Sequence, residues 1–80
     1  MADIHGDAGE LIDDLTSRGH AAEAERLNIA IAGGATGTEI LFRLRAELSS
    51  MSRRSSGLER DLRRRARKLT RAIDRQLRSI

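Results

Sequence analysis

The chain has 80 residues with no cysteine, no proline and one aromatic side chain, and it carries 15 basic and 12 acidic residues. This length predicts a single domain over residues 1–80. Without cysteine, neither a disulfide nor a thiolate metal site can stabilise it. Valine, tyrosine and tryptophan are absent, whereas alanine, leucine, arginine and glutamate are abundant. This composition disfavours strands and favours helices, so we expect an all-α fold, a small helical bundle.

Charge and hydropathy bear on location and partners. The first residues lack the basic and apolar runs of a signal peptide, and no apolar run reaches the ~20 residues of a membrane span, so we expect a cytoplasmic protein. Residues 1–40 hold two basic and eight acidic residues, a net charge of −6, whereas residues 41–80 hold thirteen basic and four acidic residues, a net charge of +9. Such asymmetry indicates an anionic partner, or two halves that attract each other.

The first part of the chain predicts an antiparallel helical hairpin. Apolar residues at i, i+3, i+4 and i+7 predict a helix over residues 8–18, with Asp7 as its N-cap and Glu10 completing a capping box. Gly19 ends this helix, and a second helix is expected over residues 20–32. Because the connection is very short, the two helices should be antiparallel neighbours.

A glycine-rich segment over residues 33–38 precedes the third predicted helix. It lacks the lysine of a P-loop and the glycine spacing of a dinucleotide-binding turn, while Thr36 and Glu39 form a capping box. We therefore interpret the segment as a helix cap and not as a ligand loop. The third helix is expected over residues 37–51. Phe42 lies off its apolar face, so it is expected to pack on the hairpin or on a second subunit.

Two interpretations are open for the junction near residues 52–56. Its serines weaken a helix, and Ser56 with Glu59 is another capping box, which favours a break followed by a fourth helix over residues 57–79. However, the apolar positions keep the same helical phase across the junction, as one continuous bent helix from 37 to 80 would require. We favour the break and retain the continuous helix as the alternative.

The last predicted helix is long and amphipathic, with one apolar edge. Apolar residues recur every three or four positions from Leu58 to Ile80 and form a stripe ~100° wide, here called the apolar stripe. Because the hairpin helices are shorter than this helix, the uncovered part of the stripe is expected to pair with a second copy, which predicts a homodimer. The expected self-association interface consists of Leu58, Leu62, Leu69, Ile73 and Leu77.

The opposite edge of the same helix is basic. It carries a line of arginines at helical spacing, here called the arginine row. The row consists of Arg60, Arg64, Arg67, Arg71, Arg75 and Arg78. The acids beside it are expected to pair along the helix at i,i+4, as Asp61 with Arg65 and Asp74 with Arg78.

No pattern in the chain indicates catalysis, a metal or a cofactor. The two histidines, His5 and His20, lack metal-ligand spacing, and no serine or threonine stands in a nucleophile motif. We therefore expect a small helical protein–protein interaction module that self-associates and is not an enzyme, with another helical or acidic protein as a further partner. The alternative is a nucleic-acid-binding regulator in which the arginine row contacts phosphates. A solvated face, or one docked on the acidic hairpin, is the simplest interpretation of such a charge run.

Overall fold

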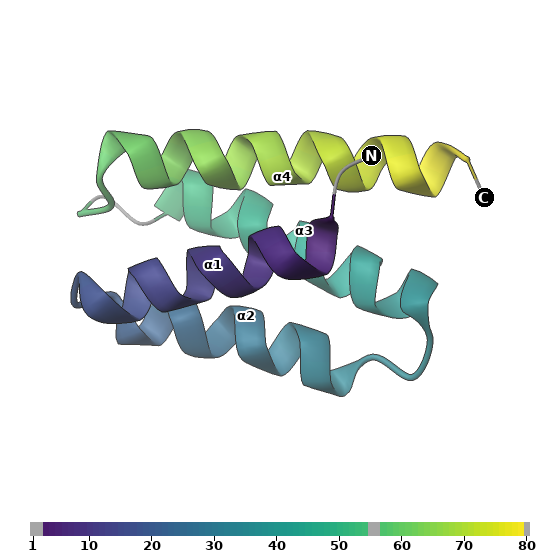
Figure 1. The fold of residues 1–80 in the computed structure, drawn as a ribbon, viewed down its shortest axis with the longest axis horizontal. Helices are drawn as coiled ribbons and strands as arrows, with labels where there is room; N and C mark the ends of the chain where they lie inside the picture. The colour runs from purple at the N-terminus through teal and green to yellow at the C-terminus, as the bar shows by residue number, and fades with distance from the viewer. Residues whose placement is uncertain (1–2, 55–56, 80) are drawn as a thin grey trace.

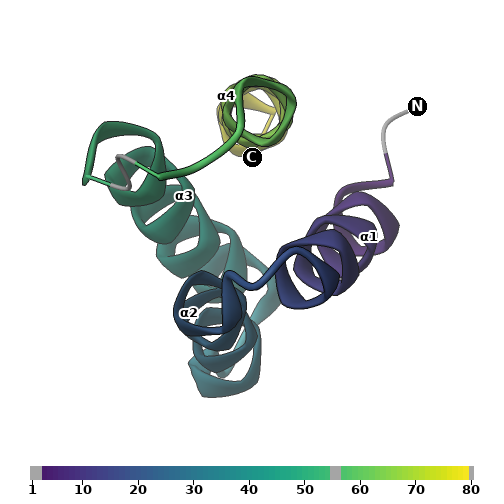
Figure 2. The ribbon, with the colours of Figure 1, turned by 90° about the vertical axis from the view of Figure 1, so that its left-hand side faces the viewer.

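The computed structural model describes residues 3–54 and 57–79, and within them the chain is all-helical (Figure 1). Four α-helices follow one another: α1, Ile4–Ser17; α2, Ala21–Gly33; α3, Gly37–Arg54; and α4, Arg60–Arg78. They pack as a ring in which α1 contacts α2, α2 contacts α3, α3 contacts α4 and α4 contacts α1. The end view shows this ring, with α4 flanked by α1 and α3 (Figure 2). The predicted all-α class is confirmed.

The core inside this ring is aliphatic. Every helix contributes leucine, isoleucine or alanine at helical spacing, and no polar or charged side chain is buried in the described part of the chain. Charged groups therefore lie at the surface, around an apolar core. The largest fully buried side chains are Leu11, Leu15, Leu27, Leu44, Leu48, Leu62 and Ile73.

Helix α1 begins earlier than the sequence predicted, so the assignment of Asp7 as its N-cap is wrong. Asp3 is the N-cap, and its carboxylate accepts a hydrogen bond of 3.0 Å from the backbone N–H of Gly6. A side chain at Gly6 would collide with that carboxylate. Ile4 is buried and extends the apolar face by one turn, which explains the earlier start.

The connections between the first three helices follow the predicted chemistry. Gly19 has φ +87°, the left-handed conformation that ends α1 and reverses the chain. At the start of α3, the hydroxyl of Thr36 accepts a hydrogen bond of 3.1 Å from the backbone N–H of Glu39, which confirms the cap. The Glu39 carboxylate pairs with Arg43 at 3.2 Å. Phe42 is 58% exposed, so the expectation that it packs on the hairpin is wrong within this fold.

The break between the last two helices is confirmed, and the continuous helix from 37 to 80 is wrong. Helix α3 extends to Arg54, and α4 runs back beside it (Figure 1). Ser56, the predicted cap, lies outside the described residues, and the N-cap of α4 is Glu59 with no side-chain capping bond. Leu58 is buried just before α4 starts, so it anchors the returning chain in the core.

Candidate functional site

From Leu58 to Ile73 the apolar stripe of α4 is covered within one chain. It packs against α1 and α3, the two neighbours of α4 in the ring. Over this range the expectation of an uncovered stripe is therefore wrong, because α3, with 18 residues, nearly matches the 19 residues of α4. The expectation rested on the lengths of the two hairpin helices and did not include α3 as a helix that covers α4. Ile80, the last residue of the stripe, lies outside the described residues. Of the expected interface, the buried residues are Leu58, Leu62, Leu69 and Ile73, and Leu77 is partly buried.

The arginine row lies on the opposite side of α4 and faces solvent. All six of its side chains are exposed, so the row does not dock on the acidic hairpin. Among the described residues, no guanidinium of the row is paired with a carboxylate, and Arg78 donates only to the backbone carbonyl of Asp74, at 3.4 Å. From Arg60 to Arg78 the row is ~27 Å long.

The middle of the row surrounds a shallow hollow on the surface of α4. Its volume is about 500 Å³ and it is wide open to solvent. The residues that line it are Arg64, Arg67, Lys68, Arg71 and Arg75, all of them cationic. Here we call it the cationic hollow. With no carboxylate among its lining residues, it favours an anion and offers planar guanidinium donors that suit phosphate or carboxylate oxygens.

The acids nearest the row are bonded to side chains outside α4. Arg18, which directly follows α1, pairs with Asp61 at 2.9 Å, and this hydrogen bond lowers the pKa of the Asp61 carboxyl. Arg45 of α3 pairs with Asp74, and this hydrogen bond likewise lowers the pKa of Asp74. Arg65 of α4 does not pair with Asp61; it pairs with Asp14 of α1. The predicted Asp61–Arg65 pair along α4 is thus wrong. Asp74 forms its ion pair with Arg45 and not with Arg78, although the charge of Arg78 also helps to lower the pKa of Asp74.

A further side-chain hydrogen bond joins the start of α4 to the hairpin turn. His20 and Glu59 are joined by a hydrogen bond of 2.6 Å between Nε2 and Oε1. This bond is the main reason that the pKa of Glu59 is lowered. Together with the Arg18–Asp61 and Asp14–Arg65 pairs, it ties one end of the α1–α4 contact.

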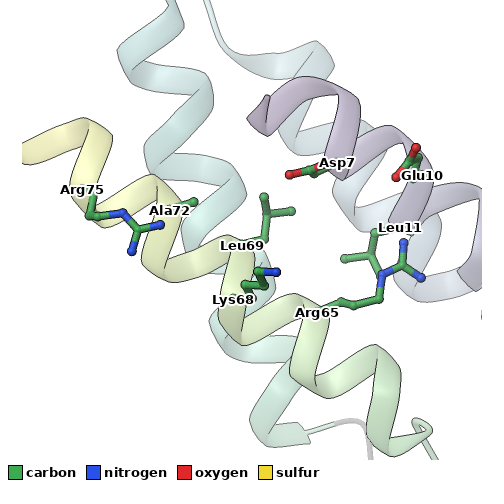
Figure 3. A pocket seen from close by; sticks show the side chains of 8 residues that line it. All are labelled: Asp7, Glu10, Leu11, Arg65, Lys68, Leu69, Ala72 and Arg75. Atoms are coloured by element: carbon green, nitrogen blue, oxygen red, sulfur yellow. The ribbon is translucent and has the colours of Figure 1, made fainter. Parts of the chain in front are cut away.

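Beside these pairs, the α1–α4 contact contains a groove of about 210 Å³ (Figure 3). Its floor is apolar, and its two sides carry opposite charges: acids from α1 and bases from α4. The floor is formed by Leu11, Leu69 and Ala72. Asp7 and Glu10 form the acidic side, and the basic side consists of Arg65, Lys68 and Arg75. Here we call it the α1–α4 groove. Because Lys68 and Arg75 also line the cationic hollow, the two features adjoin.

The sequence missed Lys68 and the α1–α4 groove. Lys68 follows Arg67 and lies off the line of the arginine row, so its role depends on how α1 packs beside α4. The spacing of residues along the last helix does not indicate how α1 packs beside it. Two large apolar side chains are also exposed, Ile29 at 57% and Phe42 at 58%. Both residues lie off the apolar faces of their helices, as their helical phase predicts.

Comparison with known proteins finds no family model, curated protein or solved structure that matches this chain. Within the described residues, no group of three or more histidine and carboxylate side chains is arranged to hold a metal ion. In the same residues, no helix combines the length and apolar character needed to cross a bilayer. Function is therefore inferred from the chain's own geometry.

Proposed function

We propose that the protein is a cytoplasmic, non-catalytic binding module whose arginine row binds the phosphate backbone of nucleic acid. The observation that carries the proposal is the row itself: six exposed guanidinium groups on one helix face, none paired with a carboxylate among the described residues. Because no ion pair has to break, phosphates can bind at the cost of ordering the arginine side chains alone. Each contact releases counterions from the nucleic acid, which drives association.

The arrangement of the row favours a duplex over a single strand. The row is carried on a helix held from both sides by α1 and α3, so the backbone positions of its arginines keep a regular spacing along ~27 Å. It contains no aromatic side chain on which bases could stack. Contacts to phosphate position a protein without reading sequence. We therefore propose duplex binding that is largely independent of base sequence.

Fluorescence anisotropy with a labelled DNA duplex at increasing salt tests this proposal. For B-DNA the log–log slope of affinity against salt is about −0.9 per phosphate contact, so full use of the row gives a slope near −5. A triple variant with Arg64→Gln, Arg67→Gln and Arg71→Gln should bind more weakly on every sequence and reduce the magnitude of the slope by up to about 2.7.

A matched control removes three exposed arginines from other helices. The control variant is Arg26→Gln, Arg43→Gln and Arg53→Gln, on α2 and α3. It has the same net charge as the row variant, so a diffuse attraction would weaken both equally. Equal weakening, or no binding of the wild type to duplex DNA at low salt, would contradict the proposal.

Self-association is the second candidate function, and the exposed apolar residues favour it. Because the apolar stripe is covered, the large apolar side chains available on the described surface are Ile29 on α2 and Phe42 on α3. We propose that any homodimer forms through these two residues and not through the stripe. Light scattering should then show a dimer that Phe42→Ser converts to a folded monomer. A wild type that remains monomeric at high micromolar concentration would contradict this candidate.

A further inference from the structure

Two recesses adjoin along α4, one between α4 and α1 and the other on the solvent-facing side of α4, and they differ in chemistry. The α1–α4 groove has an apolar floor of side chains that belong to the core, with small exposed fractions: Leu11 1%, Leu69 5% and Ala72 8%. The cationic hollow beside it is lined by lysine and arginine alone. Lys68 and Arg75 line both recesses. A ligand that covers this junction therefore meets a small apolar patch and a concentrated positive charge within one contact.

We propose that the groove and the hollow together form a docking site for an acidic peptide segment of a partner protein, with one large apolar side chain seated in the groove. The size of the groove limits the apolar part to one residue. An apolar cavity of about 150 Å³ accepts a benzene ring. The groove, at about 210 Å³, can accept one leucine or phenylalanine side chain, but not a row of them.

The charges on the two sides of the groove fix the orientation of the segment. Its acidic residues lie over α4, where Arg71 and the shared Lys68 and Arg75 can pair with carboxylates. On the α1 side, Asp7 and Glu10 repel carboxylates, so the segment must be neutral or basic there. An amphipathic helix with one apolar anchor and acids along one flank satisfies both conditions, which is the helix-in-groove mode of recognition. The repulsion from α1 excludes segments that are acidic on both flanks.

This inference goes beyond nucleic-acid binding and does not depend on it. An acidic segment in the hollow would occupy Arg64, Arg67 and Arg71, which are also part of the arginine row. Where both ligands bind, they must compete. The end residues of the row, Arg60 and Arg78, line neither recess. These two arginines therefore distinguish a ligand that follows the whole row from one that docks at its middle.

The test uses the full chain and a fluorescent synthetic helical peptide that has one leucine, with glutamates along one flank. Two control peptides replace the leucine with serine or the glutamates with glutamine, and each should bind about tenfold more weakly, since one loses burial of an apolar side chain and the other its charge pairs. A serine peptide that binds as tightly as the leucine peptide would overturn the proposal, because the groove would then be unused.

Two double variants with equal charge loss locate the contact. Lys68→Gln with Arg75→Gln should weaken peptide binding about tenfold, because these side chains line both recesses. Arg60→Gln with Arg78→Gln, the matched control, should leave peptide binding nearly unchanged while weakening duplex DNA binding. Equal weakening of peptide binding in both variants would show diffuse charge attraction and overturn the proposal.

Nuclear magnetic resonance provides a readout that is separate from the proposed function. The peptide should shift the methyl signals of Leu11 and Leu69, which lie in the floor of the groove. Duplex DNA on the outer face of α4 should shift them much less. Failure of DNA binding would leave this peptide result intact. A peptide that binds without shifting the two leucines would overturn the docking site and leave the proposed function untouched.

Discussion

The apolar stripe and the arginine row run along the same helix with the same spacing, but one is buried and the other is exposed. Leu62 and Ile73 of the stripe are fully buried between α1 and α3, whereas Arg64 and Arg67 of the row face solvent. Like charges at i,i+4 destabilise a helix by roughly 0.2–0.5 kcal/mol per pair, whereas burying one leucine or isoleucine contributes about 1.5–3 kcal/mol. The stripe can therefore offset the repulsion within the row. The comparison teaches that the packed edge stabilises the helix and leaves the other edge available for a ligand.

The largest effect on stability is expected when a buried side chain of the apolar stripe is shortened. Leu62→Ala removes a fully buried side chain and should lower the free energy of unfolding by about 2–5 kcal/mol, measured by chemical denaturation. Arg67→Ala, on the exposed edge of the same helix, should change it by no more than about 0.5 kcal/mol. Similar changes in the free energy of unfolding for the two variants would show that the stripe is not buried in this fold. The stripe would then again be a candidate self-association interface.

A smaller effect of opposite sign is expected on the exposed edge. Arg67→Glu replaces the repulsion of Arg67 with Arg64 and Arg71 by attraction, so it should raise the free energy of unfolding by about 0.5–1 kcal/mol at low salt. The same change should weaken DNA binding, because it removes one cation and adds an anion. Arg26→Glu on α2 is the matched control and should leave DNA binding nearly unchanged. If Arg67→Glu destabilised the fold, the row would have a structural role that its exposure does not indicate.

The periodic features of the fold could be predicted from sequence, and the contacts between distant segments could not. The helical phase from Leu58 onward placed the stripe and the row on opposite edges before any packing was known. The first cap was misplaced because Asp3 and Asp7 offer the same chemistry, and only the burial of Ile4 decides between them. That decision depends on α1 docking in the core.

The ion pairs show the same limit. Asp61 had an arginine four residues along its own helix, and the local rule chose it as the partner. In the fold, Arg18, which is 43 positions away in sequence, donates to Asp61. The α1–α4 groove is likewise formed by two helices from opposite ends of the described chain. Spacing along one helix holds no information about contacts between helices. The groove, and the position of Lys68 between the groove and the cationic hollow, could therefore be found only in the three-dimensional structure.

The ring of helices also has a consequence for the order in which the chain folds. Three of its four contacts join helices that are consecutive in sequence, and the α1–α4 contact alone joins the first helix to the last. Consecutive contacts close short loops and form quickly, as in other helical proteins with low contact order. The α1–α4 contact closes the longest loop and carries the largest entropic cost. We therefore expect amide hydrogens of α1 to exchange with solvent through partial openings that leave α2 and α3 protected.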